Sequence, residues 1–193
     1  MDEPARVSEI ARERHLRVCV AESLTSGRLA NTVGAGEGAS EWFAGGIVAY
    51  LTDVKERLLG LPPGTDPCSG ACAEQLAAGA LRLFDADICV STTGVGGPGP
   101  EGGHPAGTVY VGWATASARG HRALSLVGDP QQVLDDATAA AVRLLAFHLE
   151  GIRPAGPRRR NDDAEPQRRG TSPILSGAPG ADAAASASST SSS

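Results

Sequence analysis

Short apolar runs alternate along this chain with segments of helical periodicity, and this alternation constrains the fold more than any other feature. Three runs have the length and apolar content of buried strands, at residues 17–21, 45–52 and 86–96. The segments around them space their apolar residues by three and four, as an amphipathic helix does. Strands that alternate with helices form a sheet that is covered on both faces. The sequence therefore predicts the α/β class and a single three-layer α/β/α domain.

The sheet is predicted to be mixed, because the last two expected strands have the pattern of a hairpin. They span residues 107–117 and 121–127, with the turn at 118–120. The expected helices span residues 3–15, 25–33, 39–43, 70–84 and 130–149, and a short helix capped by Asp53 ends near Gly60.

The composition changes sharply near Gly151. Residues 153–193 are rich in Pro, Arg, Gly, Ala and Ser, and such a segment cannot bury enough apolar surface to offset its ordering entropy. We predict an ordered domain over residues 1–152 and a disordered tail over 153–193. The three arginines at 158–160 allow contact with acidic partners, but a solubilising tail is the favoured interpretation.

The net charge of −5 over 193 residues lacks the electrostatic footprint of a nucleic-acid-binding domain, so no nucleic-acid partner is expected. An anionic small molecule remains allowed, since its site needs only local donors. No stretch approaches the roughly 20 apolar residues of a membrane span, and residues 1–17 lack the apolar core of a signal peptide. We expect a cytoplasmic protein with no membrane partner.

The four cysteines suggest neither a metal site nor a disulfide. Cys19 and Cys89 lie in apolar runs and are expected to be small buried apolar residues. Cys68 and Cys72 lie four residues apart near the start of an expected helix. Two thiols without a second pair of ligands make a poor zinc site, and cytoplasmic thiols stay reduced.

The first candidate site is the stretch ESLTSG, residues 22–27. A strand that ends in hydroxyl residues and enters a helix directs backbone N–H groups at one point, where an anion or a developing oxyanion can bind. Ser23 lies at the turn, where a nucleophile would be exposed. Alternatively, Ser23 or Thr25 is simply the N-cap of the helix, which the local pattern favours. Glu22 is either exposed or satisfied by nearby N–H groups, and the sequence leaves both open.

The second candidate site pairs Tyr50, at a strand end, with Lys55 five residues later. A lysine with a lowered pKa is a base, and a tyrosinate near a cation can also accept a serine proton. Taken alone, the pattern favours a solvated lysine and a half-buried tyrosine.

The third candidate site is the segment from Ser91 to Val109, where a buried strand ends at Thr93 and opens into a loop with seven glycines. Ligands bind at the carboxyl ends of strands in open α/β sheets, and glycines let the backbone approach them closely. The loop is neither a P-loop nor a dinucleotide-binding GxGxxG turn. A small-molecule loop and a flexible connector fit this pattern equally well.

Together and in this order, these clusters resemble the CinA C-terminal domain family, whose bacterial single-domain members include nicotinamide mononucleotide deamidases of the PncC type. The matching segments are AESLTSG at 21–27, GAS at 38–40, GGIVAY at 45–50, Lys55, TGVGGP at 93–98 and PAGTV at 105–109. The resemblance covers about residues 5–150, nearly all of the expected ordered domain.

The resemblance implies hydrolysis of the nicotinamide carboxamide to give nicotinate mononucleotide and ammonia, with no metal and no cofactor. It implies that Ser23 is the nucleophile and that Tyr50 and Lys55 handle protons. The start of the helix after Ser23 would bind the oxyanion or the phosphate. The implied substrate-binding residues are Glu22, Thr25, Ser26, Gly27, Gly46, Thr93, Gly94 and Gly97. The implied partner is a small mononucleotide, and a homo-oligomer is allowed.

The chain departs from the family pattern at several positions. Ser26 stands where glycine is usual, which restricts positive φ there. His104 stands where lysine is common, and Pro130 and Leu134 stand where arginines are common. If those arginines hold the substrate phosphate, their loss weakens mononucleotide binding. The alternative function is therefore a diverged, non-catalytic ligand-binding or competence- or damage-linked interaction protein.

Overall fold

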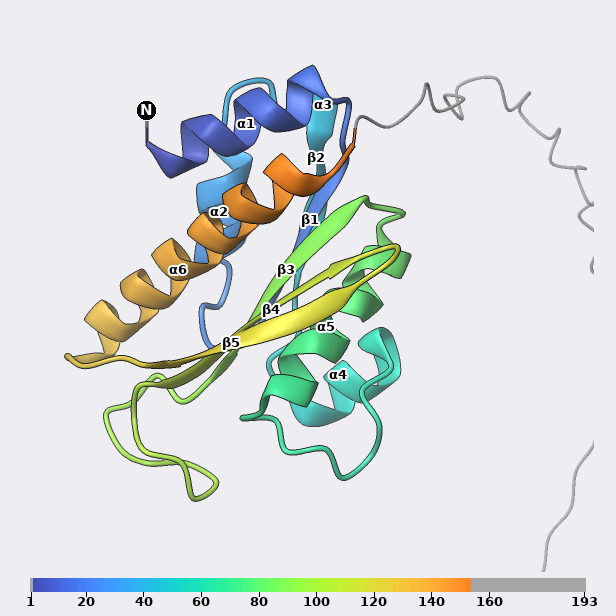
Figure 1. Cartoon of the computed structure of the whole chain (residues 1–193). Coiled ribbons are helices and arrows are strands. Elements are labelled where there is room, and N and C mark those ends of the chain that lie inside the picture. The colour runs from blue at the N-terminus through green and yellow to red at the C-terminus, as the bar shows by residue number, and fades with distance from the viewer. Residues whose placement is uncertain (1, 154–193) are drawn as a thin grey trace, which may run out of the picture. The chain divides into compact units, whose positions relative to one another are not determined.

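The computed structural model describes residues 2–153 and shows a five-stranded sheet between two layers of helices (Figure 1). The strands are β1 (Val18–Glu22), β2 (Phe43–Val48), β3 (Ile88–Gly94), β4 (Thr108–Thr115) and β5 (Arg119–Ser125). Their order in the sheet is β2-β1-β3-β4-β5. β1 is parallel to both of its neighbours, whereas β4 is antiparallel to β3 and β5. The predicted mixed sheet is confirmed.

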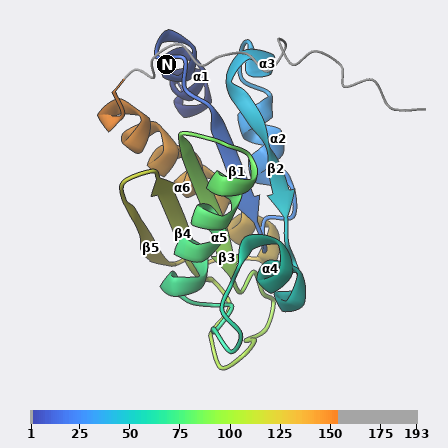
Figure 2. The same cartoon turned by 90° about the vertical axis from the view of Figure 1, so that its right-hand side faces the viewer.

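The helices cover both faces of this sheet, which confirms the predicted three-layer domain. One layer consists of α1 (Glu3–Glu13), α2 (Arg28–Gly34), α3 (Ala39–Trp42) and α6 (Pro130–Gly151). The other layer consists of α4 (Thr52–Leu59) and α5 (Gly70–Leu83). Figure 2 shows α4 and α5 in front of the sheet, with α6 behind it.

Alternate residues of the central strands feed two separate cores. In β1, Val18 and Val20 pack toward α6, whereas Cys19 and Ala21 pack toward α5. Strands that are buried on both faces need continuous apolar residues. This requirement explains the apolar sequence at residues 17–21 from which the strand was predicted. Cys19 and Cys89 are fully buried, as expected of small apolar residues.

Three local predictions are wrong. α2 begins at Arg28 rather than 25, because Ser26 and Gly27 adopt left-handed φ values of 48° and 101° that no α-helix allows. β2 ends at Val48 rather than 52, since α4 already begins at Thr52. The N-cap of α4 is Leu51, so Asp53 lies in the first helical turn and does not cap the helix.

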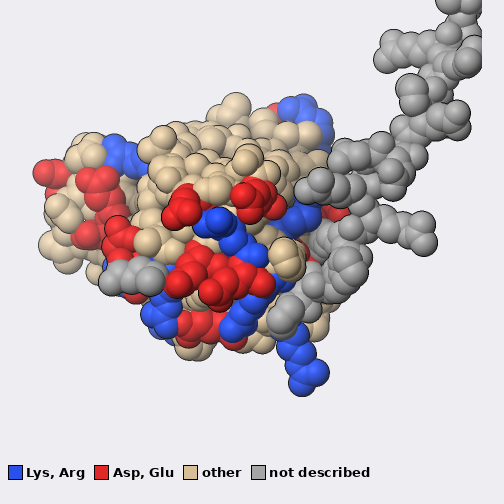
Figure 3. All heavy atoms as spheres, turned by 90° about the horizontal axis from the view of Figure 1, so that it is seen from above, with Lys and Arg blue, Asp and Glu red and all other residues tan. Residues whose placement is uncertain are grey.

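Charged side chains on the face formed around α1 alternate in sign (Figure 3). Arg6 pairs there with Glu150, and Arg12 pairs with Glu37. Within residues 2–153, no helix is long and apolar enough to cross a membrane. The cytoplasmic location and the absence of a nucleic-acid partner stay predictions. The predicted disordered tail lies outside the described residues, except for Arg153.

Candidate active site

The carboxyl ends of the parallel strands open around a cavity of about 420 Å³. The chain leaves β1 toward β2 on one side, while β3 pairs with β1 on the other. Such a switch in strand order opens a crevice that commonly binds ligands. Ser23 after β1, Tyr50 and Lys55 after β2, and Thr93 at the end of β3 all line this cavity. The structure thus brings together one residue or more from each of the three candidate sites.

Two larger hollows, of about 740 and 520 Å³, lie against α1, on the helical layer that contains α6. Neither is lined by Ser23 or by the residues at the end of β3. We assign the candidate active site to the smaller cavity because it alone, among these three, combines a strand-end serine with a buried lysine.

Glu22, the last residue of β1, is fully buried and caps helix α2 with its carboxylate. Its Oε2 accepts hydrogen bonds from the Thr25 hydroxyl at 2.6 Å, the Gly27 N–H at 2.9 Å and the Leu29 N–H at 3.0 Å. Its Oε1 accepts one from the Ala30 N–H at 2.8 Å. The sequence left open whether Glu22 is exposed or satisfied by nearby N–H groups. The structure shows that nearby N–H groups satisfy its carboxylate.

The sequence analysis expected the start of α2 to offer these N–H groups to an oxyanion or a phosphate. This expectation is wrong. The protein's own carboxylate occupies them. The helix-cap interpretation of Ser23 and Thr25 is also wrong, because the N-cap residue is Gly27 and the side chain that caps the helix is that of Glu22. Glu22, Thr25 and Gly27 lie outside the cavity lining, and they position the segment that carries Ser23.

Ser26 and Gly46 also lie outside the cavity lining. Ser26 is held at a φ of 48°, a conformation that strains a residue with a Cβ. A Cβ at Gly46 would lie 2.7 Å from Cγ2 of Val20 and 2.9 Å from Cβ of Ala30. Gly46 thus allows α2 to pack closely against the sheet, which is a structural role.

Ser23 is held by the ends of two strands and its side chain reaches the cavity. Its N–H donates to the carbonyl of Thr92 in β3 at 2.9 Å. The preceding residue, Glu22, pairs with Val48 of β2 and Thr92 of β3. Ser23 is only 7% exposed, so its hydroxyl faces a partly desolvated environment on a rigid element.

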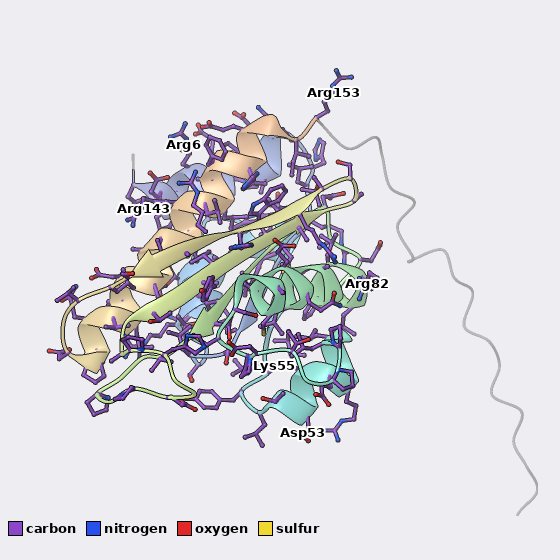
Figure 4. All side chains as sticks on the ribbon, turned by 60° about the horizontal axis from the view of Figure 1, so that its bottom comes forward. Arg6, Asp53, Lys55, Arg82, Arg143 and Arg153 are labelled. Carbon is purple, nitrogen blue, oxygen red and sulfur yellow. The ribbon has the colours of Figure 1, made fainter. Side chains whose placement is uncertain are left out.

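Lys55 is buried, contrary to the solvated lysine that its local pattern favours. It is 3% exposed, and its Nζ donates to the backbone carbonyl of Tyr50 at 2.8 Å. Burial lowers the pKa of Lys55, while the nearby Cys72 and Glu101 partly oppose this shift. Figure 4 shows Lys55 pointing inward, while Asp53 on the same helix points away.

Tyr50 lies at the rim of the cavity and is 61% exposed, not half-buried. Its contact with Lys55 uses the backbone carbonyl rather than the phenol. A proton-handling role of the phenol stays a prediction.

The glycine loop after β3 forms another wall. Thr93 donates its hydroxyl hydrogen to the carbonyl of Pro67 at 2.6 Å, which ties β3 to the segment before α5. Gly94 and Gly97 line the cavity as well. Pro130 and Leu134, the two positions without the usual arginines, lie on the same cavity.

Among the titratable residues that line the cavity, the sequence analysis did not assign Asp66, Cys68 or Glu101 to the site, and it named His104 only as a departure from the family pattern. His104 Nε2 lies 2.8 Å from Asp66 Oδ2, a pairing between two loops that no local pattern reveals. Asp66 also accepts the N–H of Cys68 at 2.8 Å, which forms a turn. This turn could have been predicted from the segment TDPCSG, because an aspartate side chain often bonds the backbone two residues later. Burial raises the pKa of the Cys68 thiol, so it is a poor nucleophile.

The fold and the cavity define an α/β protein with a cavity at the switch point of its sheet. The family model described as the CinA C-terminal domain matches residues 2–149. The chain therefore belongs to the CinA C-terminal domain family. Within residues 2–153, no group of three or more His, Cys, Asp and Glu side chains is placed to hold a metal ion.

Known relatives agree with this assignment. The chain is 44% identical over 110 residues to a putative competence-damage inducible protein of Geobacillus kaustophilus, covering 55% of this chain and 27% of that protein. It thus spans about a quarter of that relative's length. The solved structure of a CinA superfamily protein from Klebsiella pneumoniae matches with a TM-score of 0.74 and 28% identity, over 78% of this chain and 97% of that one. A CinA superfamily protein from Escherichia coli gives 0.72 and 30%, over 75% and 88%.

We expect Glu22→Gln to lower the free energy of unfolding by about 2 to 4 kcal/mol, since an amide nitrogen cannot accept from helix N–H groups. Chemical denaturation measures this loss. The control is Glu37→Gln, which changes an exposed carboxylate bonded to Arg12 and should alter stability by less than about 0.5 kcal/mol. Equal effects of the two variants would contradict the capping role.

We expect Ser26→Gly to raise the free energy of unfolding by about 0.5 to 1 kcal/mol, because glycine adopts the left-handed conformation without strain. Thermal and chemical denaturation both report it. Ser26→Ala keeps the Cβ and should bring no gain, so stabilisation by alanine as well would show that strain is not the cause.

Proposed function

We propose that the protein is a serine amidohydrolase that converts nicotinamide mononucleotide to nicotinate mononucleotide and ammonia. The family resemblance implies this reaction, and one structural observation carries it here. A strand-end serine and a buried lysine with a lowered pKa line the same cavity. Amide hydrolysis needs a nucleophile and a base that later returns the proton to the leaving amine.

In the first half-reaction, neutral Lys55 takes the hydroxyl proton of Ser23, and the serine Oγ bonds to the carboxamide carbon. Leu24 directly follows Ser23 and also lines the cavity. We assign its N–H as a donor to the tetrahedral oxyanion, in place of the helix N–H groups that Glu22 occupies. The carbon–nitrogen bond then breaks as the Lys55 ammonium protonates the nitrogen, and ammonia leaves.

In the second half-reaction, water attacks the acyl carbon and gives its proton to neutral Lys55. The bond to Ser23 Oγ breaks, the oxygen regains a proton from Lys55, and the carboxylic acid product is released. The lowered pKa of Lys55 favours both directions of transfer, since it brings the base closer to the working pH than an ordinary lysine.

One observation favours the alternative function, a ligand-binding protein without turnover. Pro130 and Leu134 give the cavity an apolar wall, where the family pattern commonly has arginines. That alternative predicts ligand binding without ammonia release, and a biological effect that survives loss of the Ser23 hydroxyl.

The direct test is ammonia release from nicotinamide mononucleotide by the purified protein. We expect turnover by the wild type and a loss on the order of 10³-fold or more in Ser23→Ala. Ser26→Ala is the matched control, because it removes a neighbouring hydroxyl that does not line the cavity, and it should keep activity. No release from the wild type at high enzyme concentration would refute the proposal and favour the binding protein.

Lys55→Met tests the base. It should lower kcat/KM by about 10² to 10⁴-fold without lowering the free energy of unfolding at about pH 7, since a buried ammonium costs stability. The pKa of Lys55 is lower in the folded protein than in the unfolded chain. At pH values between these two pKa values, the unfolded chain therefore binds more protons than the folded protein. The wild type should therefore gain stability as pH rises through that window, and Lys55→Met should lose this gain.

Activity gives the second readout for Lys55. The wild-type kcat/KM should rise with pH up to a pKa below the ordinary lysine value of about 10.4. A Lys55→Met variant that keeps its activity, or that loses stability as well as activity, would contradict the role of a buried base.

A further inference from the structure

The two edges of the sheet differ in how they are protected against pairing with another strand. β5 forms one edge, and it contains Arg119, His121 and Arg122. β2 forms the opposite edge (Figure 2), and its sequence FAGGIV contains no charged residue and no proline. Charged residues and prolines commonly keep an exposed edge strand from pairing with a strand of another molecule. The edge at β2 therefore lacks the protection that the edge at β5 has.

The backbone of β2 has free hydrogen-bonding groups on its outer side. The Ala49 N–H, just after β2, donates to the carbonyl of Glu22 in β1 at 2.8 Å. Backbone N–H groups alternate in direction along a strand, so those of Gly46 and Val48 point away from β1. Both residues are exposed. No strand in the part of the chain that the structure describes pairs with this side of β2.

Exposed apolar side chains lie next to this edge. Seven large apolar side chains are exposed among residues 2–153, and four of them lie at the end of β2 or at α4. They are Val48 (46% exposed), Tyr50 (61%), Leu51 (64%) and Leu58 (49%). We call these four residues and the outer edge of β2 the β2–α4 surface. Apolar side chains that cluster on a surface, rather than lie singly, mark an interaction site.

The charges on this surface are compatible with contact between two copies of the chain. The exposed charged residues of α4 are Asp53 and Arg57, which have opposite signs and whose Oδ2 and Nη1 lie 3.9 Å apart. A contact about a two-fold axis brings a surface against itself, so the surface must complement itself. An antiparallel pair of edge strands, an apolar cluster and two opposite charges all meet this requirement.

We propose that the protein is a homodimer in which the β2 edges of two copies pair antiparallel, about a two-fold axis beside Val48. The five strands of each copy then form one continuous sheet. The pairing satisfies the outward N–H groups of Gly46 and Val48, and it covers the exposed apolar side chains. Tyr50 belongs to this surface and lines the rim of the cavity, so the second copy lies against the candidate active site. This inference does not depend on the proposed amidohydrolase function.

Light scattering on the full chain, coupled to size-exclusion chromatography, tests the oligomeric state. We expect the wild type to have about twice the chain mass of 19.6 kDa. Val48→Lys places two ammonium groups opposite each other and should raise the dissociation constant of the dimer by on the order of 100-fold or more. Leu51→Lys changes an exposed residue outside the strand and should also weaken the dimer, without any change in the sequence of β2.

Val127→Lys is the matched control, because Val127 is 90% exposed and lies beyond β5, at the other edge of the sheet. It should leave the dimer intact. A monomeric wild type overturns the proposal. A dimer that neither Val48→Lys nor Leu51→Lys weakens also overturns it.

Hydrogen exchange of single amides locates the interface. The amides of Gly46 and Val48 should exchange about tenfold or more slowly in the wild-type dimer than in Leu51→Lys. The Ala49 amide is bonded to Glu22 in either state and should exchange equally in both proteins. A wild-type dimer whose Gly46 and Val48 amides exchange as fast as those of Leu51→Lys overturns the proposed strand pairing.

Discussion

The buried carboxylate of Glu22 is the interaction on which the site depends. It ends β1, accepts four hydrogen bonds from the turn and the start of α2, and is fully buried. A carboxylate removed from water is tolerated only when donors replace its hydration. These bonds fix the turn after β1, and so the direction from which Ser23 meets the cavity. Ser26 adopts a strained left-handed conformation within this turn.

The same interaction explains why the start of α2 is not a phosphate cradle. A strand that ends in hydroxyl residues before a helix usually offers free N–H groups. Here an acid one residue before the serine takes them. The cavity is left with a serine and a buried lysine, the pair on which the proposed amide hydrolysis rests. Lys55 is buried with a lowered pKa, a combination that is common among residues that perform chemistry.

The layers, the mixed sheet and the strand-end positions of Ser23 and Thr93 could be predicted from the sequence, because each depends on short-range periodicity. The burial of Lys55 could not be predicted, since it depends on how α4 packs in the tertiary fold, and the local pattern favoured a solvated lysine. The start of α2 was misplaced by three residues because the left-handed turn at Ser26 and Gly27 is stabilised by Glu22 through the tertiary fold. The pairing of Asp66 with His104 joins loops 38 residues apart, beyond the reach of local reasoning.

The central claim, that Ser23 attacks the carboxamide, is tested most directly by trapping the acyl intermediate. The protein is mixed with excess nicotinamide mononucleotide, quenched in acid during the first turnover, and analysed by intact and peptide mass spectrometry. The account predicts a covalent acyl group on the peptide that contains Ser23, absent from Ser23→Ala. Ammonia release with no adduct at any quench time, or an adduct on Lys55 or Cys68, would contradict it.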